Sequence, residues 1–459
     1  MILCSLSLNM IGGYAEEIEN ERTPNVIYIM ADDLGIGDLG CYGQQFIKTP
    51  AIDRLAANGI RFAQHYSGCT VSAPSRCSLM TGKHTGHSFI RGNKGVLDDE
   101  GIHFDYPLAS EELTVGEIMK RKDYVTACIG KWGMGGPGTE GHPNNQGFDC
   151  FFGYLGQANA HRYYPPFLFE NQNKLNLNKK VYSHDLIMEK ALNFIEENAD
   201  KPFFLYLAPT IPHADIIVPP DMPNEYDGMF EEKPFPGGGY TAQPKPRATF
   251  AAMVSRLDQG VQQIMDLLET RGIVGNTIVI FTSDNGTHIE GGHDPFFFHS
   301  NGAFRGYKRE LYEGGIRTPF IVHWPGKIKP GTVSYHVSAF WDFLPTMCEL
   351  IDEQTPVDID GISYLPALTG EGEQLEHDYF YWEFHEQGGK QAILKNNWKL
   401  IKLQVDDPEK ATFELYNLDR DPSEQLNAAV QYPGIVNKLH LLMEKAHQPS
   451  ILYPFEYEK

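Results

Sequence analysis

The chain has 459 residues, 41% of them hydrophobic and 21% charged, with 45 glycines and 30 prolines, which is typical of a loop-rich globular enzyme and excludes a disordered or fibrous chain. Its formal net charge of −22 argues against a nucleic-acid partner, because neutralising phosphates requires a basic surface. No apolar run approaches the roughly 18 residues that a membrane-spanning helix needs, so we expect no membrane span.

The N-terminal residues combine a short apolar stretch with small side chains, and Glu16 and Glu17 follow them. We interpret residues 1–21 as a remnant of a secretory signal or a disordered segment, although no basic residues lead it. The seven cysteines are sparse, odd in number and never spaced as C-x-x-C. They predict neither a disulfide framework nor a zinc site.

The first predicted strand is the apolar run 26–30, which ends just before Asp32 and Asp33. Three later runs are predicted to be buried strands that end in polar residues: 125–130, 202–208 and 276–282. Helices are predicted at 51–56 and 251–268 from capping residues and helical spacing. The pattern predicts an α/β fold with a large mixed, mostly parallel sheet between helices. We expect the active site beyond the carboxyl ends of the strands.

The elements become shorter after Gly361. Four short apolar segments predict an antiparallel sheet: 379–382, 391–394, 398–401 and 413–416. An amphipathic helix is predicted around 435–446. We place a domain boundary near residue 372, which gives a catalytic domain at 22–372 and a C-terminal α+β subdomain at 373–459.

The sharpest local signal is the run from Ser72 to Arg76 (Ser-Ala-Pro-Ser-Arg), which Thr81-Gly82 follows. Taken alone, five such residues also fit a Ser/Pro turn that caps a helix. The longer pattern resembles the sulfatase signature, which has Cys or Ser, any residue, Pro, Ser and Arg, and Thr-Gly after a short gap. In that family the first residue is oxidised after synthesis, so the resemblance implies a formylglycine (3-oxoalanine) formed from Ser72.

A second set of residues offers hard oxygen ligands: Asp32, Asp33, Asp284 and Asn285. Carboxylates and a carboxamide suit Ca²⁺ or Mg²⁺ and provide no soft donor for zinc. Each pair alone is more often a cap or a turn, but both pairs follow predicted strands of one sheet. In the sulfatase family these positions bind a divalent metal, usually Ca²⁺, together with the formylglycine, here at Ser72.

Further family motifs occur in the expected order along the chain. They are Gly130-Lys131-Trp132, Pro212-His213, Arg305-Gly306-Tyr307-Lys308 and the segment from Glu313 to Pro319. The chain from Pro24 to the C-terminal sheet therefore resembles a formylglycine-dependent sulfatase of the alkaline phosphatase superfamily. This resemblance implies an alkaline-phosphatase-like fold and the hydrolysis of sulfate esters.

The resemblance also implies a role for each catalytic candidate. Hydrated formylglycine at position 72 would attack sulfur with one hydroxyl and expel sulfate with the other. Arg76 would hold the hydrate, and Lys131 and Lys308 would bind sulfate oxygens. His213 is the candidate general acid for the leaving alcohol.

One position departs from the family pattern. The family commonly has His after Lys-Trp, whereas this chain has Gly133. The imidazole that usually touches formylglycine is therefore absent, which puts the sulfate-elimination step of the family mechanism in doubt. We hypothesise that His288 fills part of this space; the alternative is that His288 contributes to substrate binding or simply belongs to a loop.

The predicted substrate is a sulfated saccharide, because residues 157–166 and 381–386 mix aromatic rings with polar groups that suit a sugar ring. The same tyrosines also fit the core of a loop-rich fold. The loop at 284–299 resembles bacterial carbohydrate sulfatases, in particular exo-acting enzymes that remove a 4-sulfate from terminal galactose or N-acetylgalactosamine. The candidate substrate-binding residues are His161, His288, Arg91 and Glu383.

The resemblance further implies a serine-type formylglycine-generating maturase as a partner and a periplasmic or secreted location. Two alternatives remain open on sequence alone. One is a phosphodiesterase or phosphonate monoester hydrolase of the same superfamily. The other is a catalytically silent carbohydrate-binding relative whose Ser72 is never oxidised.

Overall fold

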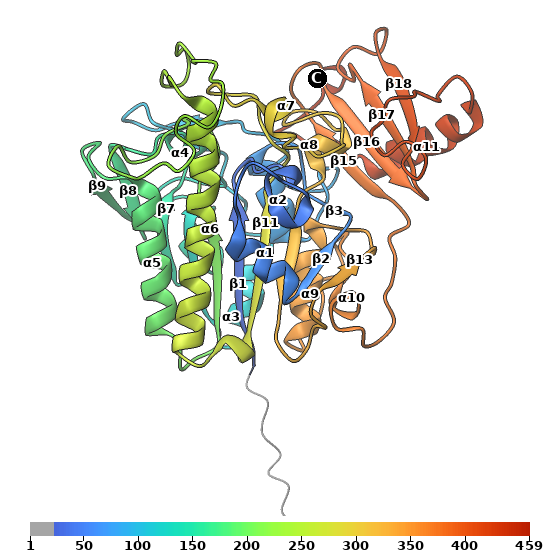
Figure 1. The fold of residues 1–459 in the computed structure, drawn as a ribbon. Helices are drawn as coiled ribbons and strands as arrows, with labels where there is room; N and C mark the ends of the chain where they lie inside the picture. The colour runs from blue at the N-terminus through green and yellow to red at the C-terminus, as the bar shows by residue number, and fades with distance from the viewer. Residues whose placement is uncertain (1–22) are drawn as a thin grey trace, which may run out of the picture.

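A ten-stranded mixed sheet forms the centre of the molecule in the computed structural model, which describes residues 23–459 (Figure 1). The predicted signal remnant at 1–21 lies outside these residues. The strands of this sheet, in spatial order, are β13 (Thr332–Ser334), β2 (Ile60–Phe62), β12 (Phe320–His323), β11 (Thr277–Ser283), β1 (Asn25–Ala31), β10 (Phe203–Ala208), β6 (Val125–Lys131), β7 (Cys150–Tyr154), β8 (Phe167–Glu170) and β9 (Asn173–Asn176).

The four central neighbours β11, β1, β10 and β6 all run parallel to one another. They are continuous apolar runs because helices cover both of their faces, so that both sides of each strand are buried. In the register of β1 and β11, Ala31 pairs with Ser283. Asp32 and Asp284 therefore leave the sheet side by side at its carboxyl edge.

Alternate residues of β1 divide the core into two layers. Ile27, Ile29 and Ala31 pack with α1, α5 and α6 on one face, and Val26, Tyr28 and Met30 pack with α2, α3 and α9 on the other. The helices are α1 (Pro50–Ala57), α2 (Ser72–Thr81), α3 (Val115–Lys120), α4 (Gln157–Ala160), α5 (Ser183–Glu197), α6 (Pro246–Thr270), α7 (Pro295–Phe298), α8 (Glu313–Ile316), α9 (Phe343–Leu350), α10 (Leu365–Thr369) and α11 (Pro433–Ala446).

The C-terminal part of the chain forms a four-stranded antiparallel sheet in the order β15 (Phe380–Phe384), β16 (Lys390–Lys395), β17 (Trp398–Leu403) and β18 (Thr412–Asn417). Helix α11 packs on one face of this sheet through Leu439 and Met443. The other face packs against Tyr66 and Trp341 of the larger part. Two further pairs are β3 (His65–Tyr66) with β14 (Ser338–Ala339), and β4 (Gly95–Leu97) with β5 (His103–Asp105).

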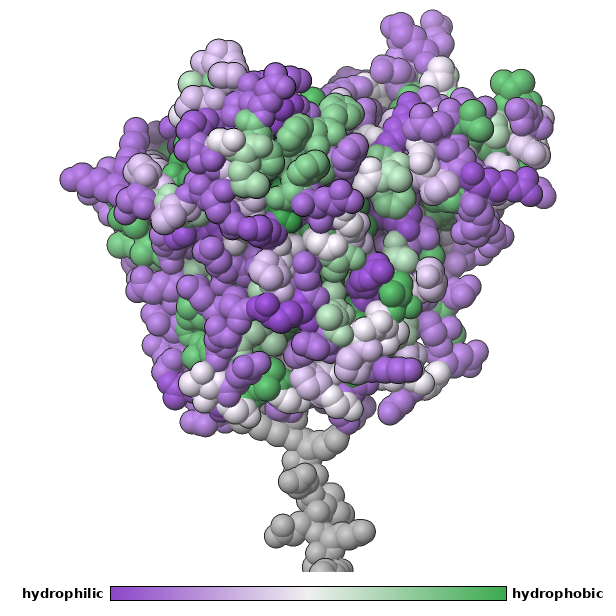
Figure 2. Space-filling view, viewed as in Figure 1, coloured by the Kyte–Doolittle hydropathy of each residue, from purple (hydrophilic) through white to green (hydrophobic). Residues whose placement is uncertain are grey.

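This architecture confirms the predicted α/β fold with its additional antiparallel sheet and packed helix. The domain boundary near residue 372 stays a prediction. Within residues 23–459, no helix is both long and apolar enough to cross a bilayer. The visible face is largely hydrophilic, apart from a group of apolar side chains near α7, where Phe296 is 73% exposed (Figure 2).

Candidate active site

The predicted catalytic residues meet at the carboxyl edge of the four central strands. Asp32 follows β1, Asp284 follows β11, Lys131 is the last residue of β6, and His213 lies beyond the end of β10. All four side chains are buried. Parallel neighbours bring these ends together, as the sequence predicts.

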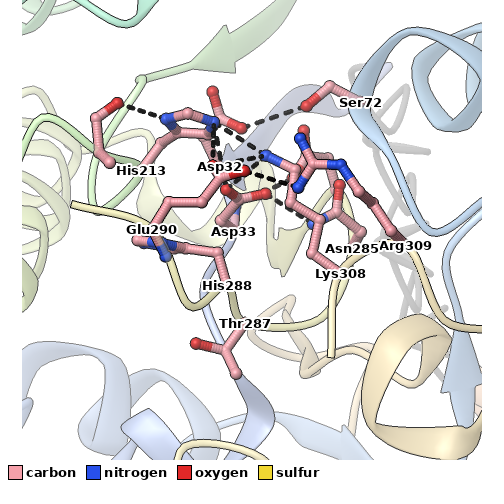
Figure 3. Close-up of polar contacts among 12 residues, drawn as sticks. Asp32, Asp33, Ser72, His213, Asn285, Thr287, His288, Glu290, Lys308 and Arg309 are labelled. Carbon is pink, nitrogen blue, oxygen red and sulfur yellow. Dashed lines mark hydrogen bonds and ion pairs between the residues drawn. The ribbon is translucent and has the colours of Figure 1, made fainter. Parts of the chain in front are cut away.

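Ser72 is the first residue of α2 and lies within this group (Figure 3). The Nζ of Lys131 donates to Asp32 Oδ2 over 2.7 Å and to Ser72 Oγ over 3.1 Å. Ser72 Oγ also donates to Asp32 Oδ1 over 3.3 Å. The side chain of residue 72 therefore stands at a helix N-terminus, where partial positive charge favours an anion.

Helix α2 places Arg76 one turn after Ser72. Arg76 Nη2 donates to Asp284 Oδ2 over 2.8 Å, and its Nη1 donates to the carbonyl oxygen of Lys131 over 2.9 Å. The helix ends at Gly82, whose φ of 71° lies in the left-handed region that glycine adopts without strain. Every side chain of α2 is buried, so packing fixes the positions of Ser72 and Arg76.

Lys308 completes a set of three ion pairs. Its Nζ lies 2.8 Å from Asp33 Oδ2, beside the pairs Lys131–Asp32 and Arg76–Asp284. Three carboxylates thus balance three cations in a group with almost no contact to solvent. A bound divalent cation would leave this group with a net positive charge, which is the sign that attracts an anionic ester.

The set of oxygen donors fits a divalent metal ion. Asn285 Nδ2 donates to Asp33 Oδ1 over 2.7 Å, which directs the carboxamide toward the carboxylates. The other atom of this amide, Oδ1, is buried and has no hydrogen-bond partner. An unpartnered buried oxygen beside three carboxylates is what an oxygen-ligated cation would satisfy.

His213 has a defined tautomer. Its Nδ1 donates to the carbonyl oxygen of Ala214, so its Nε2 carries the lone pair. That Nε2 lies 2.9 Å from Lys308 Nζ and 3.3 Å from Asp33 Oδ2. Burial lowers the pKa of His213 well below its usual range, and the charge of Lys308 lowers it further.

His161 lies against the same site. Its ring stacks on that of His213 with centroids 4.4 Å apart and planes 14° apart. Burial lowers the pKa of His161 to about 3, with a further contribution from the charge of Lys131. The residue keeps partial contact with solvent, which suits the substrate-binding role that the sequence predicts.

His288 does not occupy the position that we hypothesise for it. Its Nδ1 accepts from the backbone N–H of Glu290 over 3.0 Å, so its Nε2 carries the proton and faces the carbonyl oxygen of Pro212 at 3.3 Å. Both nitrogens are engaged by the main chain. Figure 3 shows the ring on the opposite side of the carboxylates from Ser72. This geometry gives no support to the idea that His288 fills the space at Gly133.

The structure pairs Arg91 and Glu383 with each other and does not join either to the Asp32 group by a polar contact among the described residues. Their Nη1 and Oε2 atoms lie 3.5 Å apart. Arg91 also donates to the carbonyl oxygen of Gln448 over 2.6 Å, and Glu383 accepts from Tyr381 and His385. Both are buried at the junction with the C-terminal sheet, and their predicted role in substrate binding stays a prediction.

The space at Gly133 belongs to another side chain. A Cβ atom on Gly133 would collide with Nε2 of Gln157, the first residue of α4. This Nε2 is buried and has no hydrogen-bond partner, while the backbone N–H of Gln157 donates to Asp105 Oδ2 over 3.0 Å. Sequence reasoning missed Gln157 as an individual site residue, although it opens the predicted aromatic and polar segment.

Sequence reasoning also missed Glu290 and Arg309. Glu290 Oε1 accepts from Arg309 Nη1 over 2.6 Å, and its Oε2 lies 3.7 Å from Lys308 Nζ and 3.8 Å from His213 Nε2. Burial alone would raise the pKa of Glu290, but Lys308 and Arg309 lower it to about 2. The available signals were the position of Glu290 within the loop at 284–299 and the position of Arg309 next to Lys308.

Comparison with known proteins identifies the family. The sulfatase family model matches residues 24–353, and a model of the C-terminal part of N-sulphoglucosamine sulphohydrolase matches residues 302–448. The chain is 30% identical to an N-acetylgalactosamine-6-O-sulfatase of Bacteroides thetaiotaomicron, over 93% of either chain. It is 29% identical to the human N-acetylgalactosamine-6-sulfatase, over 94% of this chain and 87% of that protein.

A solved structure agrees with these relatives. The crystal structure of Ps i-CgsB in complex with k-i-k-neocarrahexaose has a TM-score of 0.76 and 27% identity, over 93% of this chain and 94% of that one. The family model covers well over half of the chain, and the fold and the clustered motif residues agree with it. The chain therefore belongs to the sulfatase family of the alkaline phosphatase superfamily and is a sulfuric ester hydrolase.

Proposed function

We propose that this sulfatase removes sulfate from terminal galactose or N-acetylgalactosamine residues of a carbohydrate, using a formylglycine formed from Ser72 and a bound Ca²⁺. The position of Ser72 carries this proposal. Its Oγ lies at the N-terminus of α2, 3.1 Å from Lys131 Nζ and 3.3 Å from Asp32 Oδ1. A helix N-terminus, a cation and a group of oxygen ligands suit a nucleophile that meets an anionic ester.

Asp32, Asp33, Asp284 and Asn285 would hold the metal together with residue 72. Their donors are all oxygen atoms, which favours Ca²⁺, with Mg²⁺ as the weaker candidate. The unpartnered Oδ1 of Asn285 supports this assignment. When bound, the cation would supply positive charge to a sulfate oxygen and to the oxygen of residue 72.

The surrounding side chains then have separate tasks. Lys131 and Lys308 now pair with Asp32 and Asp33, and a metal that neutralises these carboxylates leaves both ammonium groups able to bind sulfate oxygens. Arg76 fixes Asp284 and the end of β6 through its two hydrogen bonds. The Nε2 of His213 is the nitrogen able to carry a proton to the departing alcohol.

The carbohydrate part of the proposal draws on the relatives. Two of them are named for N-acetylgalactosamine-6-sulfate hydrolysis, and one solved structure holds a neocarrahexaose. The sequence favours the 4-position of the ring, whereas the names of these relatives refer to the 6-position. Action on large sulfated glycans, which do not cross the inner membrane, supports a periplasmic or secreted location.

The test is sulfate release from a panel of 4- and 6-sulfated galactose and N-acetylgalactosamine, free and at the end of oligosaccharides. The protein is co-expressed with a serine-type maturase, and mass spectrometry establishes the oxidation of Ser72. We expect sulfate release that is absent from Ser72→Ala and from wild-type protein made without the maturase. If protein with unmodified Ser72 were as active as protein with oxidised Ser72, the proposed role of formylglycine would be contradicted.

The same panel separates the alternatives. Oxidised enzyme that hydrolyses phosphonate monoester or phosphodiester analogues to their alcohol products, but releases no sulfate from any saccharide, would contradict the carbohydrate assignment and favour phosphoryl transfer. Oxidised enzyme that binds these sugars without releasing any sulfate would favour a silent carbohydrate-binding protein.

A further inference from the structure

The ion pair of Glu290 and Arg309 lies beside the reaction centre but has no part in the chemistry proposed above. Figure 3 shows Glu290 between His213 on one side and Lys308 and Arg309 on the other. Its carboxylate lies 3.7 Å from Lys308 Nζ and 3.8 Å from His213 Nε2. Any sulfate ester that contacts Lys308 and His213 therefore has Glu290 as a neighbour.

This pair is more open to solvent than the catalytic group. The side chains of Glu290 and Arg309 are 16% and 32% exposed, whereas those of Asp33 and His213 are at most 1% exposed. Tyr240, which donates its hydroxyl to Glu290 Oε2 over 2.9 Å, is also partly exposed. The group of Glu290, Arg309 and Tyr240, here called the rim cluster, thus forms a more exposed edge of the catalytic group.

The backbone of Arg309 is held in an uncommon conformation. Its φ of 74° lies in the left-handed region, which residues with a side chain rarely adopt. Its N–H donates to the carbonyl oxygen of Thr70 over 3.1 Å, and its carbonyl oxygen accepts from Lys390 of the C-terminal sheet over 2.7 Å. Two separate parts of the chain therefore hold the backbone of Arg309, while Glu290 holds its guanidinium.

The chemistry of the rim cluster selects its ligand. Glu290 neutralises Arg309, so the guanidinium is poorly suited to bind a second sulfate. The cluster instead suits neutral hydroxyl groups, which can donate to the carboxylate of Glu290 and accept from the guanidinium of Arg309. The phenol of Tyr240 can also accept from a hydroxyl group. The stacked rings of His161 and His213 lie close by, with Tyr240 6.0 Å from His161 between centroids. Such a wall suits the face of a sugar ring.

We infer that the rim cluster binds the hydroxyl groups of the sugar that carries the sulfate, and that Glu290 and Arg309 determine the preference for a saccharide over other sulfate esters. This inference rests on the proposed function. Ile289 and Tyr307, which directly precede Glu290 and Lys308 in the chain, line an open pocket together with Phe235 and Phe296.

The test compares two esters on the same mature enzyme. One is the saccharide sulfate that the wild type hydrolyses best, and the other is 4-methylumbelliferyl sulfate, which has no sugar hydroxyls. The main variant is the double substitution Glu290→Gln and Arg309→Gln, which keeps the net charge beside His213 unchanged. A second variant, Tyr240→Phe, removes a single hydroxyl. The matched control is Lys48→Gln with Glu225→Gln, an exposed ion pair whose Nζ and Oε2 lie 2.5 Å apart.

We expect the ratio of kcat/KM for the saccharide to kcat/KM for the aryl ester to fall about 30- to 100-fold in the double variant, since two or more hydrogen bonds are lost. The fall for Tyr240→Phe should be about 3- to 10-fold, and the control ratio should not change. Because uniform binding is lost, the larger effect should be on KM.

Three outcomes would overturn the inference. An equal loss with both esters would place the cluster in the chemistry and overturn the inference while leaving the proposed function intact. An unchanged ratio in variants that melt like the wild type would show that the cluster does not contact the sugar. Wild-type enzyme with oxidised Ser72 that hydrolyses only the aryl ester would instead refute the proposed carbohydrate function, and the inference with it.

Discussion

The side-chain amide of Gln157 fills the space that a side chain at Gly133 would occupy. Gly133 has a φ of 80°, so its conformation disfavours a larger residue, and a side chain at this position would have to displace the amide of Gln157. In this chain, which has no histidine after Lys131-Trp132, a buried carboxamide therefore lies against Gly133. Its Nε2 has no hydrogen-bond partner within the described residues.

Gly133→Ala should destabilise the protein by about 2–4 kcal/mol, which combines the strain of a left-handed conformation with overpacking. Urea unfolding measures this change. Gly138→Ala is the matched control, because Gly138 has a φ of 69° but nothing within 4 Å of the added Cβ. The control should lose only about 1–2 kcal/mol from the conformation. In the double variant Gly133→Ala with Gln157→Ala the overpacking part should disappear, and a persistent full loss would show that Gln157 is not the obstacle.

A Ca²⁺ titration followed by thermal unfolding tests the oxygen-ligand site. At about 100 times its dissociation constant, a ligand of the folded state stabilises it by roughly 2.7 kcal/mol. We expect chelator-treated protein to show such a gain, and Asn285→Ala to lose most of it because Oδ1 is removed. Asp360→Asn is the control, because Asp360 belongs to a different cluster, in which its Oδ1 lies 2.8 Å from His87 Nδ1. Ca²⁺ should therefore stabilise this variant as it stabilises the wild type. A full response in Asn285→Ala would place the cation elsewhere.

The variant His288→Ala tests whether His288 takes over the role of the histidine that is absent at position 133. Since both nitrogens of His288 bond to the main chain of Glu290 and Pro212, the substitution should lower the melting temperature. It should not cause sulfated enzyme to accumulate during turnover, as mass spectrometry of the quenched reaction can show. Accumulation of that species would assign His288 to the elimination of sulfate, against the geometry of its ring.

The sequence predicts the site residues that lie at the carboxyl ends of strands. Asp32, Asp284 and Lys131 each stand at the end of a continuous apolar run, and neighbouring parallel strands must bring such ends to one edge. Ser72 is found because its motif is contiguous. The fold class follows from the same alternation of apolar runs and helices.

Residues on long loops escape this reasoning. Glu290 and Tyr240 lie on loops and Gln157 begins the short helix α4. The path of these segments depends on tertiary packing, and no periodicity in the sequence indicates it. Arg91 and Glu383, whose predicted role in substrate binding stays a prediction, form a buried ion pair between the two parts of the chain. Residue type alone does not distinguish a ligand from an internal ion pair.

The buried carboxyl group of Asp105 should make stability depend on pH. Burial raises the pKa of Asp105 to about 7, despite the opposing charge of Lys131, whereas an unfolded chain has an aspartate pKa near 3.9. Between about pH 4 and pH 7 the folded protein therefore keeps a proton that the unfolded chain releases. The free energy of unfolding must then fall as the pH rises through this window.

The variant Asp105→Asn removes this titration. The free energy of unfolding of the variant, relative to that of the wild type, should therefore increase with pH by on the order of 1 kcal/mol per pH unit. Urea unfolding at several pH values, without metal, measures this difference. Asp99→Asn, at an exposed position in the same segment, is the control and should follow the wild type. A constant difference between Asp105→Asn and the wild type across the window would show that Asp105 is ionised in the folded protein.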